Sequence, residues 1–234
     1  LEAKSAYELL KTNKSVIGIL LKYSSHSSYD PKKYSVNINL KNTNSIEVFQ
    51  KIGFIGAGNY AASKLLPAFS KSGANMFALS SISALKPYHL GRKYKFKKIT
   101  TNINDIFHDK EIATVVISTR HDSHAELIKK ALINNKNIFI EKPICVNENE
   151  LKMLKDLYLN LEPKKILMVG FNRRFSQFIV NIKNKLEKIK TPKSFIYNIN
   201  AGFLPAEHWI KKTDQGGRLI GEACHFIDLI RFLS

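Results

Sequence analysis

From Lys51 onward, short apolar runs alternate with segments that have the periodicity of amphipathic helices. Two of these runs, 115–117 (VVI) and 138–140 (IFI), are apolar without interruption, which is typical of strands buried on both faces. Strands separated by helices cannot pair as hairpins, so we expect parallel pairing, right-handed crossovers and helices on both faces of the sheet. The pattern predicts an α/β fold built on a doubly wound parallel sheet.

A glycine-rich loop stands where the first of these strands meets its helix. Gly56, Gly58 and Ala61 form the pattern G-x-G-x-x-A, and Asn59 lies inside it. Gly56 permits a tight turn, Gly58 lets the backbone approach a pyrophosphate, and the small Ala61 allows helix and strand to pack closely. Its position between strand and helix favours a dinucleotide-binding Rossmann domain over a merely structural glycine turn.

The second strand of such a domain usually ends in a carboxylate that binds the ribose hydroxyls of the cofactor. Here it ends in the serine-rich run 80–83 (SSIS), without a carboxylate. The Ser81 hydroxyl could bind either a ribose hydroxyl or a 2′-phosphate. Lys86 or Arg92 could add positive charge, although an ordinary helix surface is the preferred explanation of both. Either NAD or NADP is therefore expected as the cofactor.

Polar residues follow three further predicted strands at their carboxyl ends, the edge where open α/β sheets bind ligands. They are the stretches 118–121 (STRH), 141–143 (EKP) and 170–174 (GFNRR). A charged Lys142 directly after a buried strand costs stability unless it has a function or a partner such as Glu141. We expect Lys142 in an active site, with a structural ion pair as the alternative, and the bond to the following proline could be cis.

A last group of polar side chains lies near the end of the chain. A Gly-Gly pair precedes a predicted helix that carries Glu222, His225 and Asp228, and helical spacing places Glu222 and His225 near one face. Histidine titrates close to neutrality and can take the proton of a substrate hydroxyl while hydride leaves the same carbon. The alternative for His225 is a buried, hydrogen-bonded core histidine.

Together these pieces resemble the glucose-fructose oxidoreductase, inositol dehydrogenase and MocA (Gfo/Idh/MocA) family. The resemblance runs from about Lys51 to Ser234 and rests on the segments GFIGAGNYAA, STRHDSHAELIKKAL, NIFIEKP, VGFNRRF and GGRLIGEACHFIDL. It implies a Rossmann domain followed by an α/β substrate domain with a mainly antiparallel sheet. It also implies an oxidoreductase that uses NAD or NADP to oxidise or reduce a hydroxyl-bearing carbon of a sugar or cyclitol.

The resemblance also implies roles for individual residues. Lys142 matches the lysine that contacts the nicotinamide ribose and the reacting oxygen, and His225 matches the acid/base histidine. The cofactor-binding positions predicted for this chain are Gly56, Gly58, Asn59, Ala61, Ser81, Ser118, Thr119, His124, Glu141, Lys142 and Arg173.

One departure from the family concerns the catalytic residues. The family commonly has an aspartate four residues before the histidine, whereas this chain has Gly221 there and Glu222 one position later. Either Glu222 substitutes for the aspartate, or Lys142 and His225 act without it. The departure also keeps open a catalytically inactive NAD(P)-binding sensor or regulatory protein.

The resemblance suggests four parts for the chain. Residues 1–23 resemble the end of a medium-chain alcohol dehydrogenase-type domain, as in a subgroup of fused members, and residues 24–50 have the composition of a linker. Residues 51–170 form the predicted Rossmann domain. Residues 171–234 begin a truncated substrate domain, with a possible first strand after Thr191. The chain is expected to be a fragment that is inactive alone.

The net charge of +18 raises the question of a nucleic-acid partner. Lysines are scattered over almost every segment, without a basic run interleaved with exposed aromatics, so a nucleic-acid partner is not expected. No apolar stretch approaches the roughly 20 residues of a membrane helix. The two cysteines lack metal-ligand spacing, so we expect no metal and a cytoplasmic protein. The expected partner is a small sugar-like substrate, and a homo-oligomer is compatible with this interpretation.

Overall fold

The computed structural model describes residues 5, 8, 9, 11, 12, 35–38, 50–82 and 85–234. The chain divides into two units, Leu1–Pro31 and Lys32–Ser234. In the first unit the described residues 5, 8, 9, 11 and 12 are helical. Most of the expected linker lies outside the described residues.

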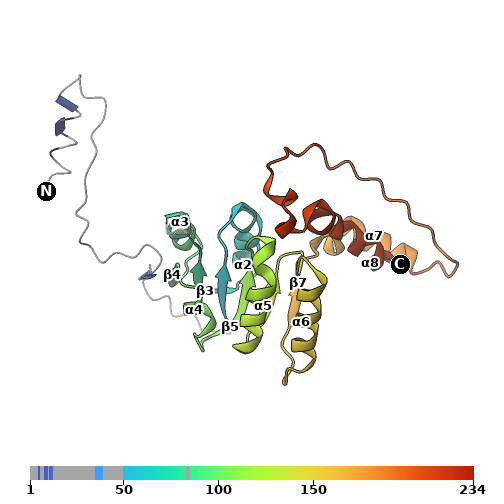
Figure 1. The fold of residues 1–234 in the computed structure, drawn as a ribbon, viewed down its shortest axis with the longest axis horizontal. Coiled ribbons are helices and arrows are strands. Elements are labelled where there is room, and N and C mark those ends of the chain that lie inside the picture. The colour runs from blue at the N-terminus through green and yellow to red at the C-terminus, as the bar shows by residue number, and fades with distance from the viewer. Residues whose placement is uncertain (1–4, 6–7, 10, 13–34, 39–49, 83–84) are drawn as a thin grey trace. The chain divides into compact units, whose positions relative to one another are not determined.

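The second unit contains one sheet with the strand order β1-β4-β3-β2-β5-β6-β7 (Figure 1). All neighbouring strands are parallel except β1 and β4, which pair antiparallel. The strands are β1 (Ser35–Asn37), β2 (Lys51–Ile55), β3 (Asn75–Ser80), β4 (Lys98–Thr100), β5 (Ile112–Ile117), β6 (Asn137–Ile140) and β7 (Leu167–Val169). The prediction of a doubly wound, mostly parallel Rossmann-type sheet is confirmed. Strand β1 lies within the segment expected as a linker.

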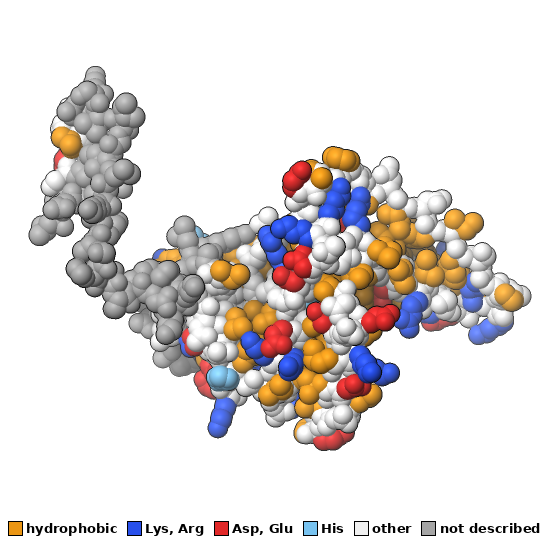
Figure 2. All heavy atoms as spheres, viewed as in Figure 1, with side chains coloured by type: hydrophobic (Ala, Val, Ile, Leu, Met, Phe, Trp, Pro, Cys, Tyr) orange, Lys and Arg blue, Asp and Glu red, His pale blue; other side chains and the backbone are white. Residues whose placement is uncertain are grey.

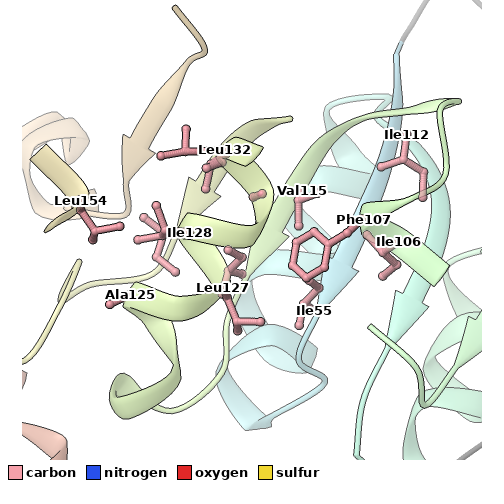
Figure 3. Packing of buried hydrophobic residues seen from close by; sticks show 14 of the residues in the cluster. Ile55, Ile106, Phe107, Ile112, Val115, Ala125, Leu127, Ile128, Leu132 and Leu154 are labelled. Atoms are coloured by element: carbon pink, nitrogen blue, oxygen red, sulfur yellow. The ribbon is translucent and has the colours of Figure 1, made fainter. Parts of the chain in front are cut away.

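Alternate residues of the central strands pack into two separate cores. Val115 and Ile117 of β5 face one cluster, whereas Val116 faces the other. This is why the apolar run is continuous instead of alternating, since both faces of the strand are covered. Figure 3 shows the first cluster, in which the Phe107 ring lies beside Ile55 and Val115.

Helices cover both faces of the sheet. The helices between the strands are α2 (Leu66–Lys71), α3 (Leu85–Lys93), α4 (Asn104–Phe107), α5 (His124–Ile133) and α6 (Glu148–Leu159). Buried residues of α4, α5 and α6 belong to the first cluster, and those of α2 belong to the second. Figure 1 shows α5 and α6 on one side of the sheet and α2 on the other. A π-helical turn, η1 (Ala61–Leu65), leads into α2.

The last sixty residues pack beyond β7 as helices and short turns (Figure 1). They comprise η3 (Asn172–Phe175), α7 (Gln177–Leu186), η4 (Trp209–Lys211), η5 (Thr213–Gln215), the π-helical turn η6 (Leu219–Ala223) and α8 (Cys224–Leu233). The strand expected after Thr191 does not form, because residues 190–205 find no neighbouring strand among the described residues to pair with.

Side chains of both signs are spread over the surface in Figure 2, and apolar side chains gather over α7 and α8. Phe178 of α7 and Ile227 of α8 are among the exposed apolar residues. No helix in the described part of the chain is both long and apolar enough to cross a membrane.

Candidate active site

The two glycines of the loop after β2 have different surroundings. Gly56 has φ of +106°, a left-handed conformation, and a Cβ added there would lie 2.6 Å from the backbone oxygen of Ser118. A Cβ added at Gly58 would meet no atom within 4 Å. Ala61 is buried, and Asn59 is exposed at the start of the helix. The loop thus has the tight turn and the open space above Gly58 that a dinucleotide pyrophosphate requires.

Ser81 lies at the end of β3, as predicted, and its backbone N–H donates to the Thr100 carbonyl at 3.2 Å. The preceding Ser80 is fully buried, and its hydroxyl has no hydrogen-bond partner in the described part of the chain. Residues 83 and 84 lie outside the described residues. The described end of this strand, residues 80–82, carries no carboxylate that would repel a 2′-phosphate.

A cavity of about 630 Å³ opens at the carboxyl edge of the sheet. It brings together six residues predicted for the site: Ser118, Thr119, Glu141, Lys142, Arg173 and His225. It is also lined by Tyr60, His121, Asn172, Ser176, Trp209 and Ile210, which were not among the predicted site residues. His121 and Asn172 do lie in the polar stretches that follow β5 and β7, so the sequence already indicated that they lie at the carboxyl edge of the sheet.

Ser118 and Thr119 form the floor of this cavity at the end of β5. The Ser118 backbone N–H donates to the Ile55 carbonyl at 2.9 Å, and its hydroxyl donates to the Gly56 carbonyl at 3.2 Å. The Thr119 hydroxyl lies 2.6 Å from that of Ser123. The two bonds of Ser118 connect the end of β5 to the glycine loop, and that of Thr119 connects it to the turn η2 (His121–Ser123).

Lys142 follows β6 directly, and its peptide bond to Pro143 is cis. The Lys142 ammonium donates a hydrogen bond to the Gly221 carbonyl oxygen at 2.6 Å. Among the described residues it makes no salt bridge to Glu141 within 4 Å. The ammonium is thus hydrogen-bonded to the π-helical turn η6 and not directly to the Glu141 carboxylate.

His225 is the second residue of α8, and its ring faces the same cavity. Its Nδ1 is buried without a hydrogen-bond partner among the described residues. The pKa of His225 is lowered to about 4, chiefly by burial and also by the nearby charges of Lys142 and Arg173, while Asp228 acts in the opposite direction. The imidazole is therefore neutral at pH 7 and can accept a proton or a hydrogen bond.

Glu141 is 9% exposed, and burial raises its pKa to about 7, although Lys142 opposes this rise. A Cβ on Gly170 would lie 2.8 Å from a Glu141 carboxyl oxygen, so a glycine is needed beside this carboxyl. Burial, and then the charge of Glu141, raise the pKa of Tyr60, whose hydroxyl accepts a hydrogen bond from the Asn172 amide at 2.9 Å.

His124 is fully buried, so it does not line the cavity. Its ring lies between two carbonyl oxygens, with Nδ1 2.6 Å from that of Pro143 and Nε2 3.3 Å from that of Thr119. It thereby connects the segment after β5 to the segment after β6. The structure assigns it a supporting position behind residues that line the cavity.

Glu222 does not reach the cavity either. Its carboxylate accepts a hydrogen bond from the Arg218 guanidinium at 2.6 Å. The neighbouring position 221 has no room for a side chain, because a Cβ there would lie 2.9 Å from Ile210 and 3.0 Å from Cε1 of His121. Gly221, where the family commonly has an aspartate, has no side chain, and the carboxylate of Glu222 is bound by Arg218. Neither residue therefore places a carboxylate in the cavity.

A charged pair fixes α8 in place. The Arg174 guanidinium, on η3, donates two hydrogen bonds to the carboxylate of Asp228, one of them 2.6 Å long. Asp228 is 9% exposed and lies one helical turn after His225. The bidentate pair therefore sets the rotation of α8 that directs His225 into the cavity.

Comparison with known proteins agrees with this geometry. The Gfo/Idh/MocA family, described as an oxidoreductase family with an NAD-binding Rossmann fold, matches residues 50–171. The chain is 28% identical to scyllo-inositol 2-dehydrogenase (NAD(+)) of Bacillus subtilis, over 78% of this chain and 52% of that protein. It is 27% identical to an inositol 2-dehydrogenase of Salmonella typhimurium, over 58% of this chain and 41% of that one.

Solved structures extend the comparison. A myo-inositol dehydrogenase from Lactobacillus casei, in complex with NAD(H) and myo-inositol, is 27% identical, with a TM-score of 0.55 over 59% of this chain and 41% of that chain. A putative myo-inositol dehydrogenase from Sinorhizobium meliloti shares the fold, with a TM-score of 0.63 at 24% identity over 78% of this chain and 54% of that one. The chain spans about half the length of the curated relatives it matches most extensively. Since the family match covers more than half of the chain and includes the glycine loop and the Glu-Lys-Pro segment, the protein belongs to the Gfo/Idh/MocA family of oxidoreductases with an NAD-binding Rossmann fold.

Proposed function

We propose that this protein transfers a hydride between the nicotinamide of NAD or NADP and a hydroxyl-bearing carbon of a sugar or cyclitol. The observation that carries this proposal is the cavity at the carboxyl edge of the sheet, which Lys142 and His225 line together with the residues that end β5. Inositol dehydrogenases among the relatives support a cyclitol as the first substrate class to test.

The glycine loop binds the cofactor in this proposal. The space above Gly58 accepts the pyrophosphate, and the amides at the start of the following helix face its charge. Ser118, Thr119, Glu141 and Arg173, which line the cavity, would contact the nicotinamide half of the cofactor. When bound, the dinucleotide supplies the hydride acceptor or donor.

Lys142 and His225 act on the reacting oxygen. The Lys142 ammonium donates a hydrogen bond to the oxygen as negative charge develops on it. Neutral His225 accepts the hydroxyl proton during oxidation and returns it during reduction. The Arg174–Asp228 pair keeps the histidine oriented toward that oxygen throughout.

The lack of a carboxylate at the end of β3 leaves both cofactors acceptable. The Ser81 hydroxyl can bind a ribose hydroxyl or a 2′-phosphate, and neither contact is repelled by a neighbouring negative charge at the described end of the strand. We propose only a modest preference between NAD and NADP.

A sensor of NAD(P) without turnover is the second candidate. The absence of a side chain at Gly221 and the engagement of Glu222 by Arg218 favour it, because neither supplies the carboxylate that commonly accompanies the catalytic histidine. The cavity position of Lys142 and His225 opposes it, since a protein that only senses the cofactor does not need them.

The test has two stages on the protein that carries this chain. Calorimetry first measures binding of NAD, NADH, NADP and NADPH. Absorbance at the nicotinamide band then follows turnover with myo-inositol, scyllo-inositol and a panel of aldoses and sugar acids. Cofactor binding with turnover on any of them supports the oxidoreductase, whereas binding without turnover over the whole panel supports the sensor.

We also propose the domain organisation expected from the sequence. Residues 1–23 would end a preceding dehydrogenase-type domain, 24–50 would link it to the Rossmann domain, and 171–234 would begin the substrate domain. The division of the chain near residue 31 supports a boundary in the proposed linker. Both cysteines are free, in agreement with a cytoplasmic location.

A further inference from the structure

A second histidine reaches the cavity from a direction that differs from that of His225. His121 lies in the 3-10 turn η2 (His121–Ser123), immediately after the polar end of β5. It lines the cavity together with Lys142 and His225, although the residue as a whole is only 5% exposed. Its ring packs edge-on against Trp209, with the ring centres 4.9 Å apart.

The hydrogen bonding of His121 determines which of its nitrogens is basic. Nδ1 lies 2.9 Å from the backbone carbonyl oxygen of Gln215. A carbonyl oxygen only accepts, so Nδ1 must carry the proton, and Nε2 of the neutral ring keeps its lone pair. Within the described part of the chain, Nε2 makes no hydrogen bond. Among the residues that the structure describes, Nδ1 of His225 has no such partner.

The position of His121 coincides with the departure at Gly221. Its Cε1 lies 3.0 Å from where a Cβ of residue 221 would stand, and Cε1 is bonded to Nε2. An aspartate at 221 would therefore project into the space now filled by the ring of His121 and by Ile210. Nε2 of His121 therefore lies next to position 221, where the family commonly has an aspartate.

We propose that Nε2 of His121 is an acid/base group of this site, which hydrogen-bonds the substrate hydroxyl and exchanges its proton. During oxidation the C–H bond breaks with its electron pair going to the nicotinamide, the C–O bond becomes double, and the one hydroxyl proton passes to Nε2 of His121 in place of His225, whose neutral ring hydrogen-bonds the same oxygen. During reduction each transfer is reversed. This assignment rests on the proposed function and adds a catalytic residue to it.

The groups that face His121 suit a base that works near neutral pH. Burial lowers the pKa of His121 below its ordinary value of 6.5, and the charges of His124 and Lys142 act in the same direction. The Gln215 carbonyl and Asp122 oppose them and stabilise the imidazolium once it forms. Arg120 lies over the ring of Trp209, with its guanidinium carbon 5.8 Å from the ring centre.

Two substitutions of His121 distinguish the hydrogen bond of Nδ1 to Gln215 from the proton transfer proposed for Nε2. In His121→Asn the amide nitrogen can occupy the place of Nδ1 and keep the bond to Gln215, while Nε2 is lost. In His121→Gln the amide nitrogen can reach the place of Nε2 but cannot accept a proton at neutral pH. His108→Asn is the matched control, because His108 is exposed after α4 and does not line the cavity.

The kinetic test uses NAD or NADP with whichever of myo-inositol, scyllo-inositol or the sugar panel the parent protein converts. We expect both His121 variants to lower kcat by about a hundredfold or more, with cofactor Kd within about threefold of the parent. For the parent, kcat of the oxidation should decrease as the pH is lowered through a value below 6.5. The pH profile of His121→Asn should lack this acidic limb. A kcat within threefold of the parent with an unchanged limb would overturn the proposal.

A measurement without substrate keeps the test independent of turnover. Nitrogen NMR of the histidine rings, with signals assigned by comparing parent and His121→Asn, reports the tautomer and titration of His121. We expect a proton on Nδ1 and a midpoint below 6.5. A proton on Nε2 of the neutral ring would refute the assignment, because Nε2 would then have no lone pair to accept the substrate proton. Lack of turnover by the parent on every compound would instead count against the proposed function itself.

Discussion

Substitution of the two loop glycines should separate folding from cofactor binding. A Cβ at Gly56 meets a backbone oxygen at 2.6 Å, and the residue has φ of +106°. The left-handed conformation costs an L-residue about 1–2 kcal/mol, and overpacking against backbone adds about 1–3 kcal/mol. Gly56→Ala should therefore lower the free energy of unfolding by about 2–5 kcal/mol.

Substitution of Gly58 should leave the free energy of unfolding almost unchanged and weaken cofactor binding. No atom lies within 4 Å of its added Cβ, so Gly58→Val should change the free energy of unfolding by no more than about 0.5 kcal/mol. The same side chain fills the space proposed for the pyrophosphate. Binding of NADH should weaken by at least about a hundredfold, which corresponds to about 2.8 kcal/mol.

Urea unfolding monitored by circular dichroism measures the first quantity, and calorimetric titration with NADH measures the second. The two glycines have contrasting surroundings, so Gly58→Val should not unfold as readily as Gly56→Ala. Equal ease of unfolding, or binding of NADH by Gly58→Val as tight as that of the parent, would contradict the assignment of the loop.

Three further predictions follow from the site and the core. Affinities for NADH and NADPH should differ by less than a hundredfold in calorimetry, since no carboxylate accompanies Ser81; a larger preference for NADH would contradict the proposed cofactor pocket. Lys142→Met and His225→Ala should each lower kcat by about a hundred- to ten-thousand-fold with little change in cofactor Kd, and the double variant should be little worse than the worse single one; full turnover by both single variants would refute the catalytic roles of Lys142 and His225. Lys136→Met should lower the free energy of unfolding by about 2–3 kcal/mol, because the buried ammonium donates to two carbonyl oxygens at 2.5 and 2.7 Å that would lose their partner; an unchanged urea midpoint would contradict this.

The sequence was sufficient to predict the sheet and much of the cavity because both follow from local patterns. Continuous apolar runs identify strands buried on both faces, and parallel strands bring their carboxyl ends to one edge. Ser118, Lys142 and Arg173 follow three different strands, so their meeting could be expected without knowing the packing of any helix.

The rest of the site depends on contacts that leave no periodic signal. Trp209 and Ile210 lie in a segment of short turns, and they reach the cavity only because that segment packs back against the end of β5. Glu222 is one residue from Gly221, yet its carboxylate joins Arg218 one helical turn before it. Strand β1 arises from a polar stretch whose composition indicates a linker, because it pairs with an available sheet edge.

The hydrogen bond from Lys142 to the Gly221 carbonyl has a consequence for ligand affinity. A free lysine side chain loses up to about 2 kcal/mol of rotamer entropy when it is immobilised. Here the ammonium is already held in one direction by a 2.6 Å bond to a residue 79 positions away. An ammonium has three N–H groups, so two remain for an arriving oxygen. Much of the ordering of this side chain is thus completed when the protein folds, which leaves more of the contact energy available to hold the substrate.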